Sequence, residues 1–170
     1  MANSSTPLIT IRDENNKEIT TPWNVETLDV NNGSSIPQSS IKTILVWNNY
    51  NSTYEAADLV GTNITTKNIN GDNLNEQLVI DKWVQADYKY RSSTTGSESF
   101  TSIGGEDVLE ICADGASDTN AENHVISGTS NSGTSVDTTH FATVKMKVVP
   151  KINALKGLHQ FKVRISGYYT

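Results

Sequence analysis

The sequence predicts an all-β protein, an antiparallel β-sandwich or jelly roll of roughly eight to ten strands with long polar loops. Apolar and polar residues alternate in several segments, turn-forming residues separate these segments, and the 170 residues contain no internal repeat or coiled-coil heptad. The length suits one domain, residues 8–170. Residues 1–7 are too polar to fold alone, and we expect them to form a flexible N-terminal arm.

The strands predicted before residue 140 are short, and clusters of turn residues separate them. Asn70-Gly71-Asp72, Gly104-Gly105 and Asp114-Gly115 are such clusters, because glycine and asparagine adopt positive φ angles at low cost. On this basis we expect strands at residues 8–12, 25–30, 41–48, 59–66, 77–90, 99–103, 108–113 and 124–127.

Helical structure is expected to be minor. Ser52 or Thr53 could cap one or two helical turns that run to residue 58, with Glu55 favourably placed in the first turn. Residues 91–98 and most of residues 115–135 are small and polar, so they bury too little apolar surface to order themselves. We expect both segments to form exposed, mobile loops, which serve either as plain surface or as partner contacts.

The clearest strand pattern lies near the C-terminus. Ala142, Val144, Met146 and Val148 alternate with polar residues, which places one face of a strand in the core. Residues 161–165 repeat the pattern, and residues 150–157 between the two segments contain both proline and glycine. We therefore expect an antiparallel hairpin with a long connection.

Composition and charge exclude several classes of protein. The net charge is −6, so the chain lacks the basic surface that nucleic-acid binding requires, and we expect no nucleic-acid partner. The longest aliphatic run ends at Trp47 after three residues, so no membrane association is expected. The first residues show neither a basic nor an apolar signal region, which predicts folding in the cytoplasm of the producing cell.

No catalytic signature is present, and the prediction is a protein without enzymatic activity or cofactor. His124, His140 and His159 lie far apart, and none has a second histidine or cysteine at a zinc-ligand spacing. Cys112, the single cysteine, lies next to aliphatic residues in the predicted strand segment Leu109-Glu110-Ile111-Cys112-Ala113, so it is interpreted as a small, half-buried apolar side chain.

Two acidic segments offer hard oxygen ligands of the kind that Ca²⁺ prefers. One segment contains Asp114, Asp118, Asn120 and Glu122, and the other spans residues 70–76. Neither segment matches an EF-hand loop, and solvation of a surface loop is the simpler interpretation.

Aromatic residues concentrate in the first half of the chain, where asparagine and aspartate are also frequent. Rings beside such polar groups are typical of sugar-binding surfaces, which keeps carbohydrate binding open, with Trp23, Tyr50 and Tyr54 as candidates. Trp47 and Trp83 each follow an aliphatic run, so we expect these two rings in the core.

Four segments together have a residue pattern similar to that of a known class of protein. They are residues 41–49 (IKTILVWNN), residues 83–87 (WVQAD), residues 104–111 (GGEDVLEI) and residues 161–170 (FKVRISGYYT). The chain resembles small β-sandwich structural proteins of tailed bacteriophages. The resemblance implies a virion component, such as a capsid decoration, collar, tail or baseplate protein, made in the bacterial cytoplasm. It assigns no functional residue.

The predicted function is therefore non-enzymatic assembly with other virion proteins or with further copies of the chain. Terminal strands can add to a neighbour's sheet, and large rings are enriched at interfaces, so the candidate contacts are Pro7, Tyr168 and Tyr169. For the two tyrosines, closing the core is an equal alternative. A carbohydrate-binding or receptor-binding module is the alternative function.

Overall fold

A computed structural model describes residues 4–30 and 36–169 of the chain. Within these residues the chain forms eight strands and three short helices, which confirms the all-β prediction. The strands are β1 (Ile9–Arg12), β2 (Lys42–Asn48), β3 (Val60–Lys67), β4 (Val84–Tyr88), β5 (Thr101–Ile103), β6 (Leu109–Glu110), β7 (Phe141–Val148) and β8 (Lys162–Tyr168). The helices are α1 (Gln77–Ile80), α2 (Lys89–Thr95) and α3 (Asp118–Glu122).

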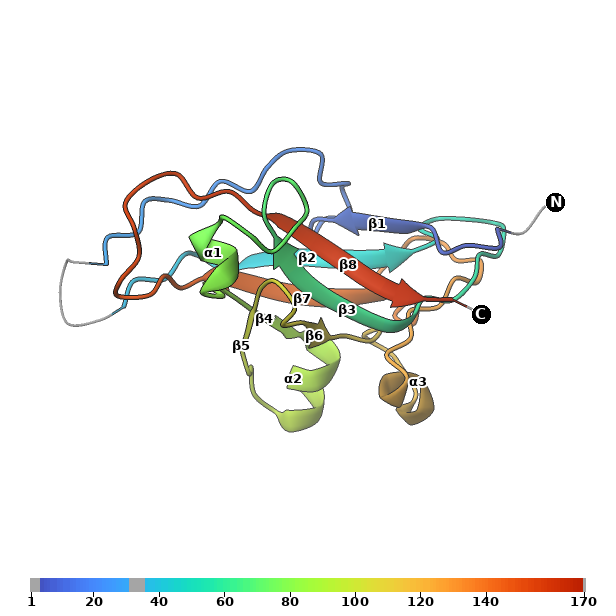
Figure 1. Cartoon of the computed structure of the whole chain (residues 1–170). Helices are drawn as coiled ribbons and strands as arrows, with labels where there is room; N and C mark the ends of the chain where they lie inside the picture. The colour runs from blue at the N-terminus through green and yellow to red at the C-terminus, as the bar shows by residue number, and fades with distance from the viewer. Residues whose placement is uncertain (1–3, 31–35, 170) are drawn as a thin grey trace.

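The strands form two antiparallel sheets that resemble a β-sandwich (Figure 1). The larger sheet has the order β1-β2-β7-β4-β5, and the smaller has the order β6-β3-β8. The first strand, β1, and the last strand, β8, therefore each occupy an edge of a sheet. Among the described residues, β8 presents one edge without a strand partner, whereas the outer edge of β1 carries a bridge between Arg12 and Glu18 and a hydrogen bond from the Ile19 amide to the Ile11 carbonyl.

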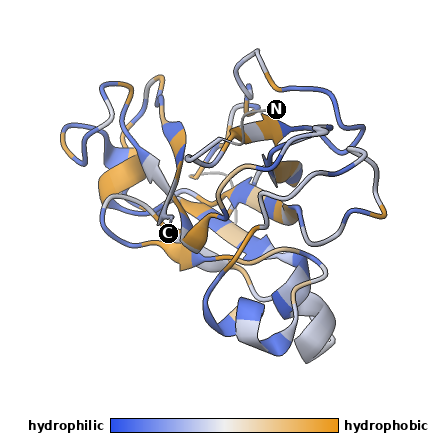
Figure 2. Cartoon of the chain, turned by 90° about the vertical axis from the view of Figure 1, so that its right-hand side faces the viewer, coloured by the Kyte–Doolittle hydropathy of each residue, from blue (hydrophilic) through white to orange (hydrophobic). Residues whose placement is uncertain are grey.

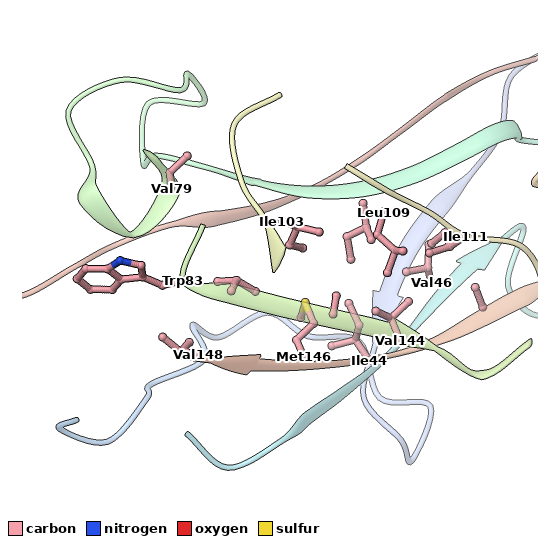
Figure 3. Close-up of a cluster of buried hydrophobic side chains, with 14 of the residues drawn as sticks. Ile44, Val46, Val79, Trp83, Ile103, Leu109, Ile111, Val144, Met146 and Val148 are labelled. Carbon is pink, nitrogen blue, oxygen red and sulfur yellow. The ribbon is translucent and has the colours of Figure 1, made fainter. Parts of the chain in front are cut away.

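The main core lies between the two sheets. Ile44 and Val46 from β2 and Val144 and Met146 from β7 lie in one cluster with Leu109 from β6 (Figure 3). The alternation predicted for residues 142–148 is confirmed, because the even-numbered side chains are buried and the odd-numbered ones only partly so. Hydrophobic segments follow the strands, whereas the loops around them are mostly hydrophilic or neutral (Figure 2).

The three side chains predicted to be buried are all in the interior. Trp47 and Trp83 are 0% and 4% exposed, and the Trp47 ring packs against Phe141. Cys112 is completely buried, more deeply than its pattern predicts.

The predicted hairpin between the last two strands is wrong. β7 lies in the middle of the larger sheet, where β2 and β4 occupy both of its edges. β8 pairs instead with β3 in the other sheet, and residues 149–161 carry the chain across. The alternating pattern identifies the buried face of each strand but says nothing about its partner.

Three further strand predictions are only partly right or wrong. Residues 77–90 divide into α1, β4 and the start of α2, because the Glu76 side chain caps a helical turn at Leu78 and Lys82 adopts a positive φ. Residues 25–30 form no strand, although Val25 and Leu28 pack against the core. Residues 124–127 contribute a single bridge, between Ile126 and Leu59.

The helix predicted after Ser52 does not form. The Asn49 side chain instead donates to the carbonyls of Tyr54 and Gly128, at 2.6 and 2.7 Å. The Tyr54 carbonyl thus receives its hydrogen bond from the Asn49 side chain, which also bonds to the loop at Gly128, and not from a backbone amide within a helix.

The two polar segments predicted as exposed loops each contain a short helix. In α2, the hydroxyls of Ser93 and Thr94 bond to the Tyr90 carbonyl, and Gly96 ends the helix in the left-handed conformation. In α3, the Ser117 side chain caps the first turn. Side chain to backbone bonds thus order segments that lack apolar anchors, and both helices remain free of buried residues.

Candidate functional site

The three aromatic residues predicted for sugar binding lie in two different places. Trp23 packs edge-on against Phe161 and lines a groove of about 680 Å³ at the margin of the main core. Tyr50 packs on Trp47 and carries the Arg12 guanidinium over its ring, and Tyr54 is 45% exposed nearby in the chain. Neither tyrosine lines the Trp23 groove, so the three rings form no common platform.

The structure does not place the predicted calcium ligands around one common site. The Asp114 carboxylate is buried and accepts from the backbone and hydroxyl of Thr143, both at 2.7 Å, beside the Lys89 ammonium. Asp118, Asn120 and Glu122 lie on α3. Throughout residues 4–30 and 36–169, no three His, Cys, Asp or Glu side chains are placed to hold a metal ion.

The predicted interface residues differ in exposure. Pro7 is half-buried, and the chain immediately after it is held to β2, since the Leu8 backbone donates to the Asn48 side chain at 2.9 Å. In the predicted N-terminal arm, the Ser4 backbone amide donates to the Glu55 carbonyl at 2.9 Å. Residues 1–3 lie outside the described residues. Tyr168 and Tyr169 are 58% and 52% exposed, so neither ring closes the core.

Tyr168 borders a shallow polar groove of about 540 Å³ on the smaller sheet, here called the Tyr168 groove. Its main side chains come from β3, β6, β8 and the end of α3, namely Asn63, Glu110, Glu122, His124, Ser166 and Tyr168. The volume lies within the range of small-ligand sites, about 300–1,000 Å³.

A β-bulge shapes this groove. The pairing of β3 with β8 shifts register between Val60 and Asn63, and Gly61 within the bulge has a φ of +59°. The Tyr168 ring lies against Gly61, and a Cβ at this position would meet its Cε1 atom at 2.5 Å. Glycine is required here both for the backbone conformation and for the close approach of the ring.

The strand register arranges polar side chains in a row across the smaller sheet. Asn63 of β3 is paired with Glu110 of β6 on one side and with Ser166 of β8 on the other. His124 lies 3.5 Å from the Glu110 carboxylate. Carboxylate, amide, imidazole and hydroxyl groups therefore face one groove that supplies both donors and acceptors.

Six exposed aliphatic side chains lie elsewhere, on the segment before α1, on α1 itself and on the connection that leads to β8. This surface, here called the apolar end, consists of Ile69, Leu74, Ile80, Ile152, Leu155 and Leu158, each between 50% and 85% exposed. Figure 1 shows the connection (red) crossing the end of the molecule that also carries α1. Single exposed aliphatics are common, whereas several on segments that hydrogen-bond to one another are a candidate interaction surface.

Specific hydrogen bonds hold the apolar end in place. The Gln77 side chain accepts from the Leu155 backbone at 2.8 Å and donates to the Asn153 carbonyl at 3.3 Å. His159 contacts the Glu76 carboxylate at 2.6 Å and the Leu155 carbonyl at 3.0 Å. Both His159 partners are acceptors, so the arrangement favours the doubly protonated imidazolium.

The sequence singled out two groove residues, Tyr168 as an interface candidate and Glu122 as a calcium candidate, and missed the other groove residues and the apolar end. The sequence does contain a signal for the bulge, because Gly61 lies inside the strand expected at residues 59–66 and glycine within a strand often marks a bulge. The row of Asn63, Glu110 and Ser166 depends on which strands pair, and local patterns do not contain that information.

Comparison with known proteins finds no match to a family model, to a curated protein or to a solved structure. Among the described residues, no helix has both the length and the apolar character needed to cross a membrane.

Proposed function

We propose that this chain is a non-enzymatic virion structural protein of a tailed bacteriophage and that it acts through protein–protein assembly. The resemblance of its sequence to β-sandwich virion proteins motivates the phage assignment. The apolar end is the observation that carries the assembly role, because soluble monomers rarely leave such a group of aliphatic side chains in water.

The arrangement of the apolar end suits a contact with another protein. Leu155 and Leu158 project from a connection whose backbone is fixed to α1 by Gln77 and His159, so little ordering is needed on binding. The partner in this proposal is another virion protein or a second copy of the chain. The virion is then the protein's location after synthesis in the host cytoplasm.

The chemistry of Cys112 argues against its use as a catalytic nucleophile. Burial, together with the nearby Asp114 charge, raises the pKa of the Cys112 thiol to about 12. The thiol is therefore protonated at neutral pH and is a poor nucleophile.

Uptake by phage particles tests the proposal. Particles of the encoding phage, assembled without this protein, are expected to bind the purified chain until their sites are saturated. The double variant Leu155→Ser/Leu158→Ser should lose this binding, because both side chains are polar after substitution and the apolar contact is reduced.

Val136→Ser provides the matched control. Val136 is 80% exposed but lies in a different loop, four residues before His140. This variant should bind particles like the parent chain. A parent chain that neither binds particles nor forms an oligomer of its own, or equal losses in the control and the double variant, would refute the proposal.

A further inference from the structure

We infer that the Tyr168 groove is a binding site for an uncharged carbohydrate. An exposed tyrosine ring stands beside a row of hydrogen-bonding side chains in an open groove of about 540 Å³. Sugars present an apolar ring face and several hydroxyl groups, and this groove offers a counterpart to each. The site differs from the aromatic candidates that the sequence alone suggests.

Tyr168 supplies the stacking surface. Its side chain is 58% exposed, although one side of the ring is supported by Gly61 in the bulge. The contact with Gly61 restricts the ring before any ligand arrives, so a sugar that stacks on it loses less side-chain entropy.

The polar row supplies the hydrogen bonds. Asn63 lies between Glu110 and Ser166 by strand register, and the three residues come from three adjacent strands. The Glu110 carboxylate accepts, and the Ser166 hydroxyl donates or accepts. The Asn63 amide donates one hydrogen to the Gly61 carbonyl at 3.2 Å and has its other hydrogen and its oxygen left for a ligand. Neighbouring hydroxyls of a sugar ring need such a mixture of donors and acceptors at close spacing.

The wall of the groove is fixed by the backbone of the bulge. The amides of Gly61 and Thr62 donate to the carbonyls of Asn123 and His124, at 2.9 and 3.0 Å. These bonds hold the end of α3 beside β3 and place His124 near Glu110. A site on paired strands with a secured wall is preorganised for binding.

The charges around the groove exclude other classes of ligand. Glu110 and Glu122 line it, and none of its lining residues is lysine or arginine, so phosphates and nucleic acids would be repelled. No aliphatic side chain lines it either, and the Tyr168 ring is its only large apolar surface, which disfavours lipids and apolar peptides. Acidic polysaccharides are disfavoured by the same two carboxylates.

The test combines a glycan array of neutral and acidic oligosaccharides with calorimetric titration of the best neutral binder. The parent chain should bind neutral glycans, and Tyr168→Ala should weaken binding about tenfold or more through loss of the stacking face. Tyr168→Phe should retain most of the affinity, because the ring remains. Glu110→Gln should weaken binding by removing a charged acceptor.

Tyr169→Ala is the matched control, since Tyr169 is a similarly exposed tyrosine but does not line the groove. Thermal unfolding of each variant establishes that it folds. Absence of binding to every neutral glycan, equal binding of acidic glycans, or an unchanged affinity in Tyr168→Ala would overturn the inference. So would a Tyr168→Ala variant that alters the mass of an oligomer rather than glycan binding, because Tyr168 would then be a protein contact.

Discussion

Gly61 is the residue on which the shape of the polar face depends. Its φ of +59° is unfavourable for residues with a side chain, and a Cβ would also meet the Tyr168 ring at 2.5 Å. Gly61→Ala should therefore lower the free energy of unfolding by about 1–3 kcal/mol, as measured by urea denaturation.

A substitution at Gly96 distinguishes the cost of the positive φ from the cost of the contact with the Tyr168 ring. Gly96 also has a positive φ, +75°, but no atom lies within 4 Å of the position that its Cβ would take. Gly96→Ala should show only the conformational cost, about 1 kcal/mol. Equal losses in the two variants would mean that the contact with Tyr168 contributes nothing.

Cys112 should be unreactive while the chain is folded. Burial raises the pKa of its thiol to about 12, with a smaller contribution from Asp114, so almost no thiolate exists near neutral pH. An aromatic disulfide reagent at pH 8 should modify the native protein only as fast as the protein opens, and should modify it at once in guanidinium. Rapid modification of the native chain would contradict the burial of this residue.

At the scale of elements, Asp87 joins β4, α2 and the chain entering β5. Its buried carboxylate accepts from Arg91 at 2.6 Å and from the Ser99 backbone at 3.0 Å. Asp87→Ala should cost about 2–3 kcal/mol in urea denaturation, less than for a fully buried pair because Arg91 is partly exposed.

The pair of Lys145 with Glu98 is the control for Asp87, because its side chains are 44% and 42% exposed, whereas the Asp87 carboxylate is buried. Lys145→Gln should change the free energy of unfolding by less than about 1 kcal/mol. A loss in Asp87→Ala no larger than this would show that the junction does not depend on Asp87.

His159 should make the stability of the connection to β8 depend on pH. Partial burial opposes its charge, but the Leu155 carbonyl and the Glu76 carboxylate outweigh it, so the pKa of His159 lies above its ordinary value of 6.5. A raised pKa in the folded state stabilises the fold fully below pH 6.5, and this stabilisation is lost as the pH rises through the raised value.

The midpoint of thermal unfolding measures this effect. It should fall between pH 6 and pH 9, and the fall should be smaller in His159→Gln, which cannot become charged. Identical pH profiles for the parent chain and the variant would contradict the assigned role of His159.

Several elements could be predicted from sequence because their determinants are local. The alternation over residues 142–148 identified both a strand and its buried face, and the aliphatic runs before Trp47 and Trp83 predicted their burial. The pairing of β8 with β3 could not be predicted, because it joins segments about 100 residues apart with no local signal. The Tyr168 groove depends on that pairing, which explains why the sequence did not bring Tyr168 together with Asn63 and Glu110.

At the scale of the whole molecule, the two candidate surfaces lie at opposite ends of β8. Leu158 of the apolar end precedes this strand and Tyr168 ends it, as Figure 1 allows the reader to follow. A strand of seven residues spans about 23 Å, so a partner bound at one surface would leave the other free. The proposed assembly contact and the inferred sugar site are therefore compatible and can fail separately.

The mass of the protein in solution as a function of concentration tests the assembly role most directly. Light scattering of the purified chain should show a defined oligomer or a monomer–oligomer equilibrium, if the apolar end pairs copies of the chain. The double variant Leu155→Ser/Leu158→Ser should then remain monomeric where the parent chain associates, and Val136→Ser should behave like the parent. A parent chain that stays monomeric at every concentration, and that also fails to bind phage particles, would contradict an assembly function for the apolar end.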